Sequence, residues 1–182
     1  MNRRITSKEA ILEQAMEIAK REGPGGISIR KLAAACKISI GSVYNYYADK
    51  EQLTDEVVAR FWEQILMDQE KIYRWGMGFT QFLEQYYHLL YGRLSHYDRG
   101  WLEEMYLRIS NEEGQDTLTP VRLLLHQVLL EDKKVNGRIW NMELNEDTFC
   151  NYVVINLMAL LRAGESNCRF LIFLLEHLLY DV

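Results

Sequence analysis

A short stretch near the N-terminus is rich in glycine, serine, asparagine and tyrosine, and it offers little aliphatic surface for packing. Gly41 would let another molecule approach the backbone closely, and Ser42 and Tyr46 can donate hydrogen bonds to phosphate oxygens. Tyr44 and Asn45 can contact the edge of a base. Recognition of duplex DNA uses these interactions. A cluster of exposed tyrosines also suits a protein interface, so both alternatives stay open at this point.

Lys50 is a further candidate for binding an anion. Asp49, followed three residues later by Gln52, predicts that a helix begins here. A cation in the first turn opposes the helix dipole, which is unfavourable unless an anion shares the ammonium and the free backbone N–H groups. A phosphate fits that position, although first-turn lysines are often only solvated.

Two short helices separated by a tight turn are expected to position these residues. Ser28 and Ser39 occupy N-cap positions ahead of the two helices. Val43 and Tyr47, four residues apart, can face the core together with Leu32, which leaves the other side of the second helix outward. This pattern predicts a helix-turn-helix, in which one helix braces a second that lies in the major groove.

The rest of the chain also favours helices, because only 2 prolines interrupt its 182 residues and apolar residues recur at helical spacing. A capping box from Thr6 to Glu9 starts the first helix, Gly23 ends it, and Ser166 opens the last one. We therefore expect an all-α fold of about nine helices. They are predicted at about residues 7–22, 29–36, 40–46, 50–72, 79–94, 99–110, 121–131, 146–163 and 167–180.

The charge is distributed unevenly along the chain. Residues 1–50 hold nine Lys and Arg against five Asp and Glu, whereas residues 51–182 hold twelve against twenty-one, giving a net charge of −5. A basic segment on an acidic body is typical of a protein that contacts a polyanion through one end. An excess this small also arises by chance, so charge alone does not decide the matter.

Several classes of protein are disfavoured. The three cysteines, without CxxC spacing, argue against disulfides and a zinc site, and no apolar run reaches the roughly 18 residues of a membrane span. The four histidines show no His-x-x-x-His spacing, and Gly-rich phosphate loops and Gly-x-Ser-x-Gly elbows are missing from the sequence. We therefore expect a cytoplasmic protein that is not an enzyme and needs no metal or cofactor.

The last two predicted helices are apolar around most of their circumference. Residues 149–163 include twelve apolar residues in fifteen, and residues 170–180 include nine in eleven. A helix of a small protein normally buries one face, so burying a second face calls for another molecule. Pairing of these two helices with their copies across a two-fold axis would form a homodimer whose interface lies at about residues 146–181. The alternative is that these helices form the centre of a monomeric bundle.

Three motifs between Ile11 and Phe61 are similar to those of a known protein family. They read Ile-Leu-x-x-Ala-Met-x-Ile-Ala, then Ile-Ser-Ile-Arg-Lys-Leu-Ala, then Ile-Ser-Ile-Gly-Ser-Val-Tyr-Asn-Tyr-Tyr-x-x-Lys-x-x-Leu. This segment resembles the N-terminal domain of the tetracycline-repressor (TetR) family of bacterial transcription regulators. The resemblance implies a DNA-binding domain at residues 1–50 and an effector-binding and dimerisation domain at residues 51–182.

The resemblance also implies roles for single residues. Phosphates would be contacted by Ser28, Arg30, Ser42, Tyr46 and Lys50, and base edges by Ile40, Gly41, Tyr44 and Asn45. Arg4, in the basic N-terminal segment, is a further candidate for DNA contact. Ile40 departs from the family, where polar or basic residues are common; it can touch a thymine methyl but cannot recognise guanine. Tyr46 and Tyr47 replace the commoner His and Phe.

The middle of the chain holds more aromatic residues than packing of a small bundle needs, which is typical of a pocket for a small hydrophobic or aromatic effector. Most of these rings must still be ordinary core. The candidate pocket residues are Trp62, Phe82, Tyr86, Trp101, Met105, Tyr106, His126 and Tyr152.

Together these observations predict a ligand-responsive transcription regulator, most simply a repressor. It would bind a palindromic operator in double-stranded DNA as a homodimer and leave it when a small molecule binds. The alternative is a helical ligand-binding or protein-interaction dimer that does not bind an operator.

Overall fold

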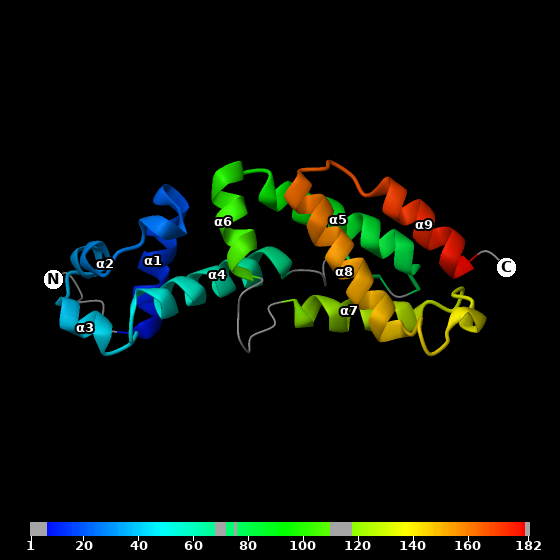
Figure 1. The fold of residues 1–182 in the computed structure, drawn as a ribbon, viewed down its shortest axis with the longest axis horizontal. Helices are drawn as coiled ribbons and strands as arrows, with labels where there is room; N and C mark the ends of the chain where they lie inside the picture. Colours follow the sequence, from blue (N-terminus) through cyan, green and yellow to red (C-terminus); the bar gives the residue numbers. More distant parts are fainter. Residues whose placement is uncertain (1–6, 68–71, 75, 110–117, 181–182) are drawn as a thin grey trace. The chain divides into compact units, whose positions relative to one another are not determined.

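A computed structural model describes residues 7–67, 72–74, 76–109 and 118–180 of the chain. Within these residues it contains nine α-helices and no strand, which confirms the expected all-α fold (Figure 1). The helices are α1 (Lys8–Glu22), α2 (Ile29–Cys36), α3 (Ile40–Tyr44), α4 (Lys50–Leu66), α5 (Phe79–Leu94), α6 (Arg99–Ile109), α7 (Thr119–Glu131), α8 (Glu146–Ala163) and α9 (Arg169–Tyr180).

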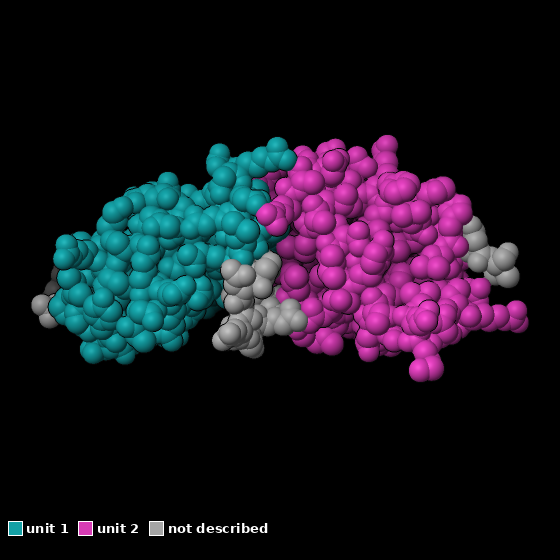
Figure 2. All heavy atoms as spheres, viewed as in Figure 1, with its two compact units in different colours: residues 1–64, 98–115 teal, residues 65–97, 116–182 magenta. Residues whose placement is uncertain are grey.

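The chain divides into two compact units (Figure 2). Unit 1 comprises residues 1–64 and 98–115, and unit 2 comprises residues 65–97 and 116–182. Unit 1 therefore contains α1 to α3, most of α4, and α6, whereas unit 2 contains α5 and α7 to α9. The functional boundary expected after residue 50 stays a prediction, and the compact unit that contains the first three helices extends beyond it.

The helices of unit 1 begin and end at local signals. Ser7, not Thr6, is the N-cap of α1: its hydroxyl oxygen accepts a hydrogen bond from the Ala10 N–H at 3.2 Å. Thr6 lies outside the described residues. Gly23 follows α1 with a φ of +79°, as a glycine can at no steric cost. A 3₁₀ turn, Pro24–Gly26, then leads to α2.

The core of unit 1 includes α6. Trp62 on α4 is fully buried, and its indole N–H donates to the carbonyl of Met105 on α6 at 3.2 Å. The ring of Trp62 lies 4.9 Å from that of Tyr106, centroid to centroid. Because these contacts join segments 43 residues apart, sequence periodicity could not reveal them.

A buried carboxylate joins three helices of unit 2. Asp132, directly after α7, accepts hydrogen bonds from the Phe79 N–H at the start of α5 (2.8 Å), from the Tyr180 hydroxyl at the end of α9 (2.6 Å) and from the Lys134 N–H (3.0 Å). Burial raises the pKa of Asp132, but these hydrogen bonds outweigh it and hold the pKa below its usual value. Asp132 thus caps α5 from a distant part of the chain.

The ends of the later helices agree with the sequence in part. The range predicted for α8 is the one observed, with a capping box between Asn145 and Thr148 and a left-handed Gly164 at its end. Helix α7 begins at Thr119, two residues before the expected start at residue 121. Ser166 is not the N-cap of α9, because this helix begins at Arg169 and not at residue 167 as predicted.

The described part of the chain holds no helix with the length and apolar character that a bilayer crossing demands. The cysteines Cys36, Cys150 and Cys168 are buried and form no disulfide. Burial raises the pKa of the Cys150 thiol to about 12 and that of Cys168 to about 11, so both stay protonated at neutral pH.

Candidate nucleic-acid interface

Helix α3 is held by its own cap and by two buried side chains. The Ser39 hydroxyl oxygen accepts from the Ser42 N–H at 3.1 Å. Val43 and Tyr47 are fully buried, as their spacing predicts. The helix ends at Tyr44, two residues earlier than expected, and a turn follows. The buried pair fixes which side of α3 faces outward.

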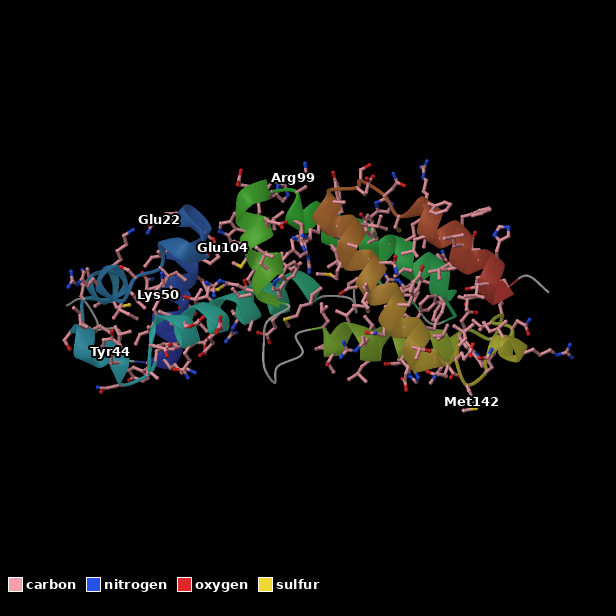
Figure 3. All side chains as sticks on the ribbon, in the orientation of Figure 1. Glu22, Tyr44, Lys50, Arg99, Glu104 and Met142 are labelled. Carbon is pink, nitrogen blue, oxygen red and sulfur yellow. The ribbon has the colours of Figure 1, made fainter. Side chains whose placement is uncertain are left out.

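The outward side carries the predicted base-contacting residues. Tyr44 is 51% exposed and Ile40 is 44% exposed, and Gly41 and Asn45 are also exposed. Tyr44 is labelled on α3 in Figure 3. This side combines a phenol, an amide and an apolar side chain, which can respectively contact a base edge, bond an adenine and touch a thymine methyl.

Gly41 has no role in the folding of α3 that requires a glycine. It is absent from the positions with positive φ, and a Cβ added there would meet only the Ser39 hydroxyl oxygen, at 3.9 Å. Alanine would therefore fit the described chain and favour the helix. The bare backbone is an advantage only if another molecule approaches it closely.

The predicted phosphate-contacting residues flank this side. Ser28 caps α2, accepting from the Lys31 N–H at 3.2 Å, so its hydroxyl hydrogen is left to donate elsewhere. Arg30 is exposed on α2, and Tyr46 is 38% exposed after α3. The Ser42 hydroxyl lies 2.8 Å from that of Ser39. Arg4 lies outside the described residues.

Lys50 is the first residue of α4, as expected, but its ammonium has a partner. It donates to the carbonyl of Gly25 in the turn between α1 and α2, at 3.2 Å. The predicted cap is confirmed: Asp49 accepts from the Gln52 N–H at 2.8 Å, and the Gln52 side chain accepts from the Ala48 N–H at 2.7 Å. A phosphate bound by Lys50 would therefore compete with the Gly25 carbonyl.

Helix α6 contacts the same turn within unit 1. The Trp101 indole N–H donates to the carbonyl of Ala19 at 2.6 Å. A Cβ added to Gly25 would lie 3.3 Å from a Glu104 carboxylate oxygen, so Glu104 lies against the turn. Figure 3 labels Glu104 and Lys50. The aromatic composition predicted Trp101 as a pocket residue, and no local sequence pattern could reveal a hydrogen-bond partner 82 residues away.

The predicted pocket residues divide between the two units. Trp62, Trp101, Met105 and Tyr106 belong to unit 1, and Phe82, Tyr86, His126 and Tyr152 belong to unit 2. In unit 2, the rings of Phe82 and Tyr86 stack at a centroid distance of 5.7 Å, and the Tyr86 hydroxyl donates to the carbonyl of Leu66 at 3.0 Å. Burial raises the pKa of Tyr86. These contacts are those of a packed core, and the pocket remains a prediction.

Unlike Phe82 and Tyr86, the predicted pocket residues His126 and Tyr152 do not lie in the packed core. The His126 ring lies 3.5 Å from a carboxylate oxygen of Asp147. Tyr152 is 52% exposed on the outer side of α8, beside the exposed Ile155. That position suits contact with another molecule better than it suits an interior wall.

Tyr47, expected to face the core, has an unusual environment. Its ring is fully buried, with the Lys8 ammonium 5.3 Å from the ring centroid, and its hydroxyl has no hydrogen-bond partner among the described residues. Burial, followed by the nearby charges of Glu56 and Glu9, raises the pKa of this phenol. It is a neutral packing residue of the helix-turn-helix.

The geometry of unit 1 is that of a helix-turn-helix with an outward, polar second helix, and the comparison with protein families agrees. Residues 11–57 match the family model "Bacterial regulatory proteins, tetR family". Over residues 11–57 this chain is therefore similar to tetR-family regulatory proteins. The resemblance drawn from the motifs between Ile11 and Phe61 is confirmed for these residues.

Solved structures resemble this chain in fold. The regulator FadR from Bacillus subtilis in complex with stearoyl-CoA is 15% identical with a TM-score of 0.58, covering 94% of this chain and 97% of that one. The fatty acid degradation regulator FadR from Bacillus halodurans is 16% identical with a TM-score of 0.59, covering 98% and 97%. A comparison with curated proteins finds no match.

Proposed function

We propose that this chain is a cytoplasmic repressor that binds a palindromic operator as a homodimer and is released by a small hydrophobic effector. The observation that carries the proposal is the outward side of α3. It presents Tyr44, Asn45 and Ile40 around a glycine whose bare backbone the fold does not need. Nothing about this surface serves catalysis, and no enzymatic activity is proposed.

In this proposal the base edges are contacted by Ile40, Gly41, Tyr44 and Asn45, and the phosphates by Arg4, Ser28, Arg30, Ser42, Tyr46 and Lys50. Ile40 favours a thymine at its position, since an isoleucine contacts the methyl group but offers no hydrogen bond to guanine. The operator should therefore contain an A·T pair in each half-site near the first residue of α3.

The experiment begins with selection of bound duplexes from a random pool, followed by titration of the preferred duplex. Tyr44→Ala should cost about 1–3 kcal/mol of binding free energy and relax the sequence preference, because a base contact is lost. Lys50→Ala should weaken binding to all duplexes about equally, because a phosphate contact is lost. Fluorescence anisotropy with the selected and a scrambled duplex measures both.

Lys20→Ala is the matched control, since Lys20 lies on α1 and pairs with Glu17 at 2.8 Å. The affinity of Lys20→Ala for the selected duplex should equal that of the parent. Equal affinity of the parent, Tyr44→Ala and Lys50→Ala would contradict the assignment of α3 to the groove. It would favour the alternative, a helical interaction dimer without an operator.

A long-chain acyl-CoA is the effector class to test first. Two observations support it: the fold likeness to a FadR whose structure contains stearoyl-CoA, and the aromatic residues of the helices after α3. Stearoyl-CoA should release the selected duplex, whereas free CoA and stearate should not, because free CoA lacks the acyl chain and stearate lacks the phosphorylated CoA group. Release by none of the three would reject this effector class and leave DNA binding intact.

A further inference from the structure

Lys37 is the one non-glycine residue with positive φ in the described part of the chain. It lies directly after α2, with φ 58° and ψ 40°, in the left-handed region. The Cβ of an L-residue crowds the backbone there, which is why glycine usually occupies the position after a helix and asparagine comes next. A lysine is therefore an unfavourable choice for stability.

The fold makes this conformation obligatory. The Lys37 N–H donates to the Ala34 carbonyl at 3.2 Å, and the Ile38 N–H donates to the Ala33 carbonyl at 3.0 Å. These two hydrogen bonds close the last turn of α2 and direct the chain toward Ser39, the cap of α3. Any residue at position 37 must adopt the left-handed conformation for the helix-turn-helix to form.

The ammonium of Lys37 is also unusual in having no partner among the described residues. Among the other described cations of unit 1, only Arg30 also lacks a partner for its side chain. Arg99 has an interaction of its own. The remaining cations of unit 1 bind a carboxylate or a carbonyl, as follows: Lys8 with Glu56, Lys20 and Arg21 with Glu17, Lys31 with Glu22, Lys50 with Gly25, Arg60 with Glu9 and Arg108 with Asp55.

We propose that Lys37 is a phosphate-contacting residue of the DNA interface, kept at a strained position because its ammonium binds the duplex backbone. The inference rests on the proposed DNA-binding function and adds to it a residue outside the sequence motifs. Strain retained at an exposed position is typical of functional residues. Lys37 lies two residues before the cap of α3, and its long side chain reaches outward from the turn without specifying any base.

The test exploits opposite effects on stability and binding. Lys37→Gly removes both the strain and the charge, so its thermal unfolding midpoint should rise while its affinity for a duplex of mixed sequence falls severalfold. The slope of log affinity against log salt should become less steep by about one for each subunit bound, the change that follows from the loss of one phosphate contact. Lys37→Arg should retain the parental slope, and Lys20→Ala serves as the charge-matched control.

Parental affinity and slope in Lys37→Gly would overturn the proposal, whatever its stability. A loss equal to that of Lys20→Ala would also overturn it, because net charge alone would then explain the effect. Selection of a preferred sequence by the parent is measured separately. If the parent shows a Lys37-dependent slope but no preferred sequence, the contact stands and the repressor function fails; if the parent binds no duplex, both fail.

Discussion

At the scale of single residues, Gly41 and Lys37 depart from what stability would select in opposite ways. Gly41 is a glycine where alanine would fit the helix, and Lys37 is a lysine where glycine would fit the turn. Natural proteins give up stability in this way at binding sites. The two residues flank Ser39, so both unfavourable residues lie at the start of the same short helix, α3.

Gly41→Ala should separate folding from binding. The added methyl group has no neighbour nearer than 3.9 Å, and alanine is favoured over glycine in a helix by about 0.5–1 kcal/mol. The free energy of unfolding in urea should therefore rise by an amount of that order. Affinity for the selected duplex should fall, because the methyl group occupies the space of close approach.

The control for this substitution is Gly92→Ala on α5. A Cβ there meets nothing within 4 Å, so stability should rise as in Gly41→Ala, but DNA affinity should not change. Unchanged DNA binding in Gly41→Ala would show that nothing approaches the backbone at this position.

At the scale of helices, local signals were predictable and distant partners were not. Ser28, Ser39 and Gly164 act on groups within a few residues of themselves, so the sequence alone located the first residues of α2 and α3 and the last residue of α8. Asp132 acts on Phe79 and Tyr180, which are 53 and 48 residues away. No spacing rule connects such residues, and the same limit hid the partner of Lys50.

Asp132→Asn should loosen the junction of α5, α7 and α9. The charged acceptor of three hydrogen bonds is replaced by a neutral amide, which should lower the free energy of unfolding by about 1–3 kcal/mol at neutral pH. Because the folded pKa of Asp132 is lowered, its contribution is present above the unfolded pKa of about 3.9 and is lost as the pH falls through the folded pKa.

Urea titrations at neutral and acidic pH measure both effects. The variant should lose less stability than the parent on acidification, so the two should converge below pH about 4. Asp147→Asn is the control, since Asp147 is 92% exposed and should lose little. A constant difference between Asp132→Asn and the parent at all pH values would contradict the assigned ionisation.

At the scale of the whole molecule, the two units have different surfaces to cover. Unit 1 presents the polar side of α3, whereas unit 2 leaves large apolar side chains exposed on α8 and α9. These side chains are Tyr152, Ile155, Phe170, Phe173, Leu174 and Leu178. Sequence composition predicted this excess because both helices are apolar on more than one face. It could not tell which side chains the monomer covers, since that depends on packing against α5 and α7.

Phe173→Asp and Ile155→Asp should each convert a dimer into monomers. Burying one large apolar side chain contributes about 1.5–3 kcal/mol, and in a two-fold interface each residue occurs twice. A charge at either position would also be buried without a partner. Sedimentation velocity should show a dimer for the parent and a monomer for both variants. The salt dependence of DNA binding should fall to about half, because each monomer contributes one set of phosphate contacts.

Met142→Asp is the control, because Met142 is 98% exposed in the connection between α7 and α8 and should not affect association. A second check is the midpoint of thermal unfolding, which should rise with protein concentration in the parent and in Met142→Asp but not in the monomeric variants. If both aspartate variants remain dimers, the interface lies elsewhere, and the exposed Leu123 and Leu130 on α7 become the positions to substitute. If the parent is itself a monomer, the palindromic operator loses its basis, since one helix-turn-helix occupies only one half-site.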